Sequence, residues 1–356
     1  MRVVISIPTK FHLFNVIREL DKLDVSLKVF SERPKFFLRN ENLPLDRFTA
    51  LPGWLFTVDV LRQFFRTNVP FQSWMLYNGL RSFDKRVAKR LPECEIFHSF
   101  HFFGLESAKA AHKKGAKWVC ESITGHHVAQ EQILEREYAK LGIPYQKHDP
   151  RQIAYSLESY EEADVILCAS DFAERSFVEQ GIPHRKIKVI PYASDISAFY
   201  PENLSLDSTK FRVLFVGGLS VTKGLYYLLR AIDIAQIPNC EVILAGQTVT
   251  ETAVILNAVP NVQPQIIGQV SKDQLRKLYN TCDVFVLPSV QDGFGIVISE
   301  ALACGCPVIA STNTGGQNVI RDSHNGFVVQ AGDEYALAEK LIWLFENREA
   351  RYQMRK

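Results

Sequence analysis

The feature that most constrains the fold is an alternation in the second half of the chain. Short runs of β-branched and other apolar residues recur there, separated by stretches with the apolar spacing of helices. The predicted strands are 211–218, 241–246, 264–268, 283–289, 307–311 and 326–329, and the helical stretches include 223–235, 271–280, 295–305 and 333–347. Strands that are apolar throughout and alternate with helices indicate a parallel sheet covered on both faces. The second half is therefore predicted to be a doubly wound α/β domain.

The first half repeats this alternation less regularly. Its candidate strands are RVVISIP, VSLKVF, EIFHSF, KWVCESI, DVILCAS and KIKVIPY, with the helical stretch FHLFNVIREL after the first. Residues 52–80 are aromatic and turn-rich and interrupt the pattern as an insertion-like helical segment. A length of 356 residues suggests two domains. Because periodicity lapses near 192–210, we expect one Rossmann-like domain at 1–195, a linker at 196–209 and a second at 210–356, with a cleft between them.

Charge excludes some classes of partner. The formal net charge of +2 is too balanced for a dedicated nucleic-acid-binding protein. The charge is uneven, however, because residues 1–150 hold 23 Lys and Arg against 16 Asp and Glu. A basic half beside an acidic half suggests two surfaces with different partners.

The apolar runs and the cysteines indicate the cellular compartment that we expect for the protein. The sequence shows no membrane-spanning stretch, and its N-terminal apolar run is shorter than that of a secretory signal. The seven cysteines are odd in number and scattered, which favours a reducing cytoplasm. Cys304 and Cys306 form a C-x-C pair with no further ligands nearby, so we expect no metal there.

A glycine-containing turn at 216–225 directly follows a predicted strand. Gly217 and Gly218 allow a ligand to approach the backbone, and Lys223 lies at the start of the next helix. This arrangement favours an anion such as phosphate, although it matches neither the P-loop nor the dinucleotide-binding pattern. The alternative is an ordinary strand-to-helix turn with a solvated lysine.

A second turn lies within 288–311. Gly293 and Gly295 stand at the start of a helix, Asp292 precedes it, and Glu300 follows Asp292 by eight residues. Just over two helical turns separate the two acids, so both can face one cleft. Backbone N–H groups at the helix start would bind phosphate or sugar oxygens. The alternative assigns Asp292 to an N-cap and Glu300 to the helix surface.

These residues resemble glycosyltransferase family 4, which has the GT-B architecture of two Rossmann-like domains. The resemblance runs from about residue 160 to residue 347, and a third glycine turn, STNTGGQNVI, lies within it. Its motifs keep the order and spacing of the family, and they are EEADVILCAS, KIKVIPYASDISAFYP, FVGGLSVTKGL, LYNTCDVFVLPS, DGFGIVISEALACGCPVIAS and NGFVV. Several matches over nearly two hundred residues make it specific.

The resemblance implies roles for individual residues. Lys223 would hold the diphosphate of a nucleotide-sugar donor, Asp292 would contact the transferred sugar, and Glu300 would bind the ribose. Ile267 and Gly268 fall where the nucleobase usually rests. The backbone that would line the sugar and phosphates belongs to Gly217, Gly218, Gly293, Phe294, Gly295, Ile296 and Val297.

The resemblance also implies a reaction. Family members retain the anomeric configuration of the sugar and generally need neither metal nor other cofactor. The donor would be linked to UDP or GDP, and the acceptor would be a glycan or lipid-linked hydroxyl in cell-surface polysaccharide assembly. Two alternatives stay open: a nucleotide-sugar epimerase or hydrolase of the same fold, and a nucleotide-sugar-binding subunit with weak or no turnover.

Three departures from the family pattern bear on these expectations. Gly218 stands where the family usually has an arginine, a second cation on the phosphates. The first acid of the E-x7-E motif is Asp292, one methylene shorter. The sequence stops at RYQMRK, where family members usually continue into a helix that crosses back to the first domain.

The acceptor side depends on histidines and a basic segment. In the family, a histidine lies near the donor sugar, and His126 aligns there better than His127, although both could be ordinary loop residues. The spacing of His98 and His101, without a third ligand, favours a structural role for both, whereas His12 could equally well contact the acceptor. The basic amphipathic segment 81–91 could rest on an anionic membrane or simply present a solvated helix face.

Overall fold

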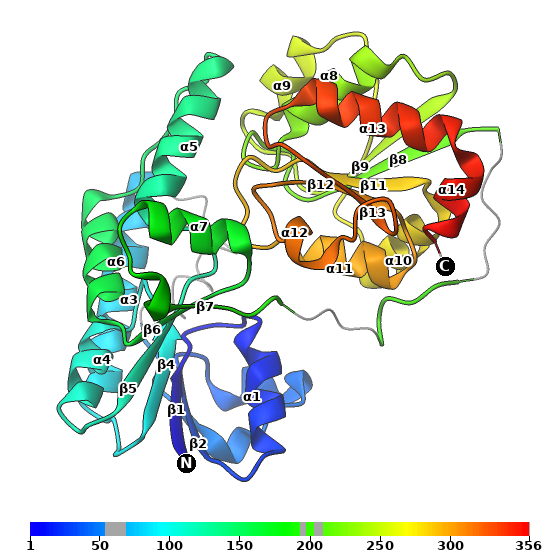
Figure 1. Ribbon diagram of the computed structural model, residues 1–356. Helices are drawn as coiled ribbons and strands as arrows, with labels where there is room; N and C mark the ends of the chain where they lie inside the picture. The colour runs from blue at the N-terminus through cyan, green and yellow to red at the C-terminus, as the bar shows by residue number, and fades with distance from the viewer. Residues whose placement is uncertain (54–68, 193–196, 203–208, 356) are drawn as a thin grey trace. The chain divides into compact units, whose positions relative to one another are not determined.

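The computed structural model describes residues 1–53, 69–192, 197–202 and 209–355. The chain forms two compact units, each built on one sheet (Figure 1). Unit 1 comprises residues 1–123, 148–168 and 181–188, and unit 2 comprises 124–147, 169–180 and 189–356. Two segments from the first half of the sequence therefore group with the C-terminal sheet.

The sheet of unit 1 has seven strands in the order β3-β2-β1-β4-β5-β6-β7. The strands are β1 Arg2–Ser6, β2 Ser26–Ser31, β3 Phe48–Ala50, β4 Ile96–Phe100, β5 Lys117–Glu121, β6 Val165–Cys168 and β7 Ile187–Val189. β1 pairs in parallel with β2 on one side and with β4 on the other. The strand order therefore reverses between β1 and β4, and open parallel sheets bind ligands beyond the carboxyl ends of strands at such a reversal.

The six strands predicted in the first half all form, whereas β3 was not predicted. The helices of unit 1 are α1 Leu13–Asp21, α3 Val69–Ala88, α4 Leu105–His112 and α6 Pro150–Glu162, with 3₁₀ turns η1 Lys35–Glu41, η2 Leu45–Arg47 and η3 His184–Lys186. A capping side chain marks the residue at which one of these helices begins. At α6 the Asp149 side chain accepts a hydrogen bond from the Arg151 N–H at 2.9 Å. Of the predicted segment 52–80, residues 54–68 lie outside the described residues.

The sheet of unit 2 has six strands in the order β10-β9-β8-β11-β12-β13, all paired in parallel. They are β8 Phe211–Val216, β9 Cys240–Ala245, β10 Gln265–Gly268, β11 Val284–Leu287, β12 Val308–Ser311 and β13 Gly326–Val329. These strands confirm the six predicted for the second half. The strand order reverses between β8 and β11, which again marks a ligand-binding position at the carboxyl ends.

Helices pack on both faces of this sheet. The helices of unit 2 are α5 His127–Lys140, α7 Asp171–Glu179, α8 Leu225–Ala235, α9 Thr252–Ala258, α10 Lys272–Thr281, α11 Ile296–Ala303, α12 Gly316–Val319, α13 Glu334–Glu346 and α14 Arg348–Gln353. One apolar core joins the sheet to α8 and α13, and a second joins it to α10 and α11. All four residues of β11 are buried. The second half is thus doubly wound, as predicted. Among the described residues, no helix is long and apolar enough to cross a membrane.

Candidate functional site

The loops that follow β8 and β11 meet at the reversal of the unit 2 sheet. The Lys223 Nζ lies 2.5 Å from Asp292 Oδ2, an ion pair between residues predicted to bind the donor. The Asp292 side chain is largely buried and that of Lys223 is about one-third exposed. A cation therefore stands beside an acid at the position where this sheet type binds ligands.

Glycine makes the close approach of these loops possible. Gly224 is the N-cap of α8, with a φ of 72°, and a Cβ there would lie 1.9 Å from the Pro288 carbonyl oxygen. Any other residue would push the two loops apart. Gly218 differs, because a Cβ on it would meet nothing within 4 Å. The position that lacks the usual arginine of the family therefore has room for a side chain.

Backbone hydrogen bonds hold the loop from 288 to 296 in place. The Asp292 N–H donates to the Asn313 carbonyl at 3.0 Å, and the Gly315 N–H donates to that of Phe294 at 2.7 Å. The Phe294 N–H donates to Asp292 Oδ1 at 3.3 Å, so this side chain shapes its own loop. Phe294 is buried. The third glycine turn, which follows β12, thus supports the second.

Helix α11 begins immediately after this loop. Gly295, with a φ of 76°, is its N-cap, and Ile296 is its exposed first residue. Gly293 is tied to α7, because the Ser170 hydroxyl donates to its carbonyl at 2.6 Å. The predicted backbone from Gly293 to Val297 therefore comprises the loop before α11 and the first two residues of that helix, and the N–H groups at a helix start favour anionic oxygens.

Glu300 lies further along α11 and has its own neighbours. Burial raises the pKa of its carboxyl, while Lys272 and the fully buried Tyr279, both on α10, partly offset that effect. The Asp292 carboxylate instead pairs with Lys223. The two acids of the D-x7-E motif are therefore held by different partners, and Tyr279 is a neighbour that the sequence analysis missed.

Ile267 and Gly268 end the edge strand β10. The Gly268 carbonyl accepts from the Gly246 N–H at 2.8 Å, which joins this strand end to the loop after β9. Gly268 has a φ of 72°, and no atom lies within 4 Å of its added Cβ. The strand end predicted to receive the nucleobase is thus part of the same carboxyl edge as the loop of Lys223.

His126 is the N-cap of α5. Its Nδ1 accepts from the Val128 N–H at 3.3 Å, and its own backbone N–H donates to Ser176 Oγ at 2.8 Å. The side chain is buried. Burial, assisted by the neighbouring His127, lowers the pKa of His126 to about 4. The ring is therefore neutral near pH 7, and its Nε2 carries the proton because Nδ1 is an acceptor.

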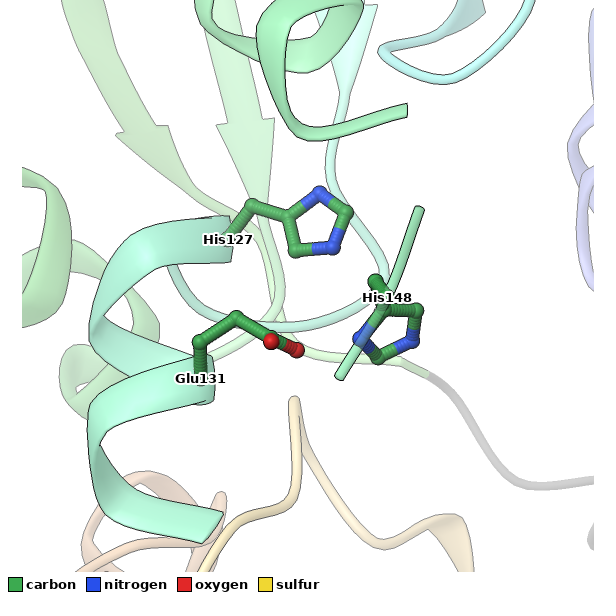
Figure 2. A group of neighbouring side chains, drawn as sticks. All are labelled: His127, Glu131 and His148. Carbon is green, nitrogen blue, oxygen red and sulfur yellow. The ribbon is translucent and has the colours of Figure 1, made fainter. Parts of the chain in front are cut away.

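His127 lies in the first turn of α5, one helical turn before Glu131. Figure 2 shows both side chains projecting to the same side of the helix. Glu131 Oε1 accepts from the Tyr145 hydroxyl at 2.7 Å. The third side chain drawn in Figure 2, His148, belongs to unit 1.

A carboxylate and two histidines meet at the reversal of the unit 1 sheet. Glu121 ends β5 and is 2% exposed. Its carboxylate is hydrogen-bonded by His12 Nε2, just after β1, and by His98 Nε2 on β4, the latter at 2.9 Å. Burial raises the pKa of Glu121, but the bonds from His12 and His98 outweigh it and bring the pKa to about 2. Both histidines were candidates from the sequence, whereas Glu121 was not predicted, although its position at a strand end was an available signal.

His98 and His101 are both buried, which is in keeping with a structural use. The basic segment 81–91 forms the end of α3 and the residues after it. Its apolar residues Phe83, Val87 and Leu91 are at most 3% exposed and belong to the core of unit 1. Its exposed residues are the cations Lys85, Lys89 and Arg90, so the apolar side chains are not placed to enter a bilayer.

Family models cover the chain in two parts. The model described as glycosyltransferase family 4 matches residues 10–197, and the model of group 1 glycosyl transferases matches 197–356. An uncharacterised glycosyltransferase of Methanocaldococcus jannaschii is 33% identical over 189 residues, which is 49% of this chain and 48% of that protein. The capsular polysaccharide biosynthesis glycosyltransferase CapM of Staphylococcus aureus is 28% identical over 208 residues, 53% of each. The chain spans about half the length of these curated relatives.

Solved structures resemble the chain over its full length. A sucrose-phosphate synthase from Thermosynechococcus elongatus has a TM-score of 0.72 at 20% identity, covering 100% of this chain and 92% of that one. HepE from Anabaena, in complex with UDP and glucose, has a TM-score of 0.69 at 17% identity, with the same coverage. These similarities show the fold, which is GT-B. The match of the family model to residues 10–197, more than half of the chain, establishes that the chain belongs to glycosyltransferase family 4.

Proposed function

We propose that the chain is a retaining glycosyltransferase that uses a nucleotide-sugar donor linked to UDP or GDP. It transfers the sugar to a hydroxyl of a glycan or lipid-linked acceptor in cell-surface polysaccharide assembly. The observation that carries the proposal is the ion pair between Lys223 and Asp292 at the reversal of the unit 2 sheet. Two of the similar proteins support this choice of donor and acceptor. CapM is named for capsular polysaccharide biosynthesis, and HepE was solved with UDP and glucose bound.

The Lys223–Asp292 pair suits departure of a diphosphate. As the bond from the anomeric carbon to phosphate oxygen breaks, its electrons stay with the nucleoside diphosphate. The acceptor oxygen bonds to that carbon, and its proton passes to the departing phosphate oxygen. The Lys223 ammonium and the N–H groups at the start of α11 offset the charge that grows on the phosphate. With Lys223 turned to phosphate, Asp292 can accept a hydrogen bond from the sugar. No metal is required for these steps.

Glu300 and the end of β10 are assigned to the nucleoside. The Glu300 carboxylate would accept two hydrogen bonds from the ribose diol, which offsets the cost of its burial. Ile267 and Gly268 would lie against the base. His126 would donate its Nε2–H to a sugar hydroxyl, since a ring with a pKa of about 4 is a weak base near pH 7.

The proposal places the reaction in the cytoplasm. All seven cysteines are free thiols, and six of them are buried. Free thiols in a chain of this size agree with a reducing compartment.

A panel of donors tests this function. UDP, GDP, ADP and their glucose, galactose, mannose and N-acetylglucosamine conjugates are titrated by calorimetry, and those that bind are incubated with glycan and lipid-linked acceptors. The expected result is one preferred base and a product whose anomeric configuration, read by NMR, matches the donor. A chain that binds no nucleotide would contradict the proposal, as would a product of inverted configuration for the retaining mechanism.

Gly218 favours a second candidate, a nucleotide-sugar-binding subunit with weak turnover, because the usual cation is absent there. We expect Gly218→Arg to tighten donor binding by about tenfold, since the site has room and a guanidinium binds phosphate in two-point fashion. Calorimetry with the preferred donor measures this. Gly218→Gln, which adds length without charge, is the matched control. Equal affinity of all three proteins would show that the position lies away from the phosphates.

A further inference from the structure

A tyrosine hydroxyl is buried beside the acid that the proposed function assigns to the ribose. Tyr279 lies on α10 and Glu300 on α11, and the two helices pack against each other. Tyr279 is fully buried, and its hydroxyl has no partner at hydrogen-bonding geometry among the described residues. Burial raises the pKa of this hydroxyl, and the neighbouring Glu300 carboxylate raises it further. The hydroxyl therefore stands next to a carboxylate without being fully bonded to it.

Packing fixes the position of the tyrosine ring. Its centroid lies 6.0 Å from that of Phe199 and 5.5 Å from that of Phe285, and both rings meet it edge on. The backbone of Tyr279 is also held, because Arg355 donates a hydrogen bond to its carbonyl at 3.2 Å. Glu300 is only partly buried, so its side chain has more freedom than the ring. A hydrogen bond between the two would form by movement of Glu300 towards the hydroxyl.

The hydroxyl has a use that offsets the cost of burying it. A buried donor without a full bond costs free energy, and a phenylalanine of the same shape would avoid that cost. Glu300 can accept hydrogen bonds from a ribose diol only when it is ionised. Burial raises the pKa of Glu300, while Lys272 and Tyr279 act against this effect. A hydroxyl that donates to one carboxylate oxygen favours the ionised form and fixes the orientation of the group.

We propose that Tyr279 is the positioning residue for Glu300, and that the pair gives the site a preference for ribose over 2′-deoxyribose. When a nucleotide binds, the Tyr279 hydroxyl donates to one Glu300 oxygen, and the carboxylate accepts from the diol. A site built to bond both sugar hydroxyls rejects an analogue that lacks one, because its buried acceptor is then left unsatisfied. This inference rests on the proposed function and adds to it a residue that acts through Glu300.

Calorimetry with UDP, GDP and their 2′-deoxy analogues tests the inference without an acceptor. We expect the unchanged protein to bind the preferred ribonucleotide about a hundredfold more tightly than its deoxy analogue. Tyr279→Phe should reduce this ratio to about tenfold, with little change in affinity for the deoxy analogue. With the preferred nucleotide-sugar, KM should rise by a similar factor at constant kcat, since the ribose lies away from the bond that breaks.

A double-variant cycle shows whether Tyr279 acts through Glu300. Glu300→Ala should abolish the preference for ribose. In the Glu300→Ala background, Tyr279→Phe should then cause no further loss of nucleotide affinity, because no carboxylate remains to be positioned. Additive losses would overturn the inference.

Tyr160→Phe is the matched control. Tyr160 is a fully buried tyrosine on α6 of unit 1, and its replacement should leave nucleotide affinity unchanged. Tyr279→Phe should melt at a temperature no lower than that of the unchanged protein, since it removes a buried hydroxyl that lacks a full bond. A preference for ribose that survives in Tyr279→Phe, or an equal loss of affinity for both nucleotides, would overturn this inference and leave the proposed function standing. A protein that binds none of the nucleotides would overturn both.

Discussion

Replacing Lys223 with alanine is expected to lower kcat/KM for the preferred donor by about a hundredfold to a thousandfold. The change removes the cation at the phosphates and leaves the Asp292 carboxylate without the partner that lies 2.5 Å away. That carboxylate, with no cation beside it, would then repel the diphosphate. Initial rates over a range of donor concentrations give kcat and KM separately. Lys223→Arg should keep part of the activity, because it retains the charge.

Lys210→Ala is the matched control for this prediction. Lys210 lies just before β8, at the amino end of the same sheet, and pairs with Glu241 at 3.5 Å. Its removal takes the same charge from unit 2 without touching the carboxyl edge, so kcat/KM should stay unchanged. Folding should survive in both variants, since a partly exposed ion pair contributes about 1 kcal/mol or less. A Lys223→Ala enzyme as active as Lys210→Ala would remove the observation on which the proposed function rests.

Replacing Glu121 with glutamine is expected to destabilise unit 1 by about 3 kcal/mol. The buried carboxylate accepts hydrogen bonds from His12 and His98, and a neutral amide cannot serve both histidines in the same way. Hydrogen exchange of the β4 and β5 amides measures the loss within unit 1. Glu158→Gln, which removes an exposed acid paired with Lys109, is the control and should change exchange little.

The same residue predicts a pH dependence. The pKa of Glu121 falls from an ordinary 4.5 to about 2 on folding, which corresponds to about 3 kcal/mol. Because the folded pKa is the lower one, this stabilisation is fully present above pH 4.5. It is lost as the pH falls from 4.5 through about 2. The unchanged protein should therefore lose stability over this interval more steeply than Glu121→Gln, and equal slopes would contradict the assignment.

The sheets could be predicted because burial on both faces makes their strands apolar throughout. All four residues of β11 are buried, and its sequence shows no polar alternation. The glycine turns could also be predicted, because a glycine such as Gly224 indicates a close approach of two loops that a residue with a side chain does not permit. β3 escaped prediction because its three residues carry too little pattern.

Contacts between distant segments could not be predicted in the same way. Lys223 and Asp292 are 69 residues apart, and no local pattern states that they touch. His98 and Glu121 lie on two strands and His12 follows a third, and only the topology brings these strands together. Each was visible as a residue type near a strand end, but their mutual hydrogen bonds depend on the order in which the strands are arranged.

The interleaving of the two units bears on how the protein can be divided. The chain passes from one unit to the other five times, so neither unit is a continuous stretch of sequence. Helix α5 is bound to the C-terminal part by Tyr138, whose hydroxyl donates to Glu251 at 2.7 Å, and by Glu137, which accepts from the Tyr227 hydroxyl. A fragment cut at residue 197, where the two family models meet, would deprive α5 of these partners and expose apolar surface on both products. Dissection by limited proteolysis or by cloning should therefore yield aggregating halves rather than two independently stable proteins.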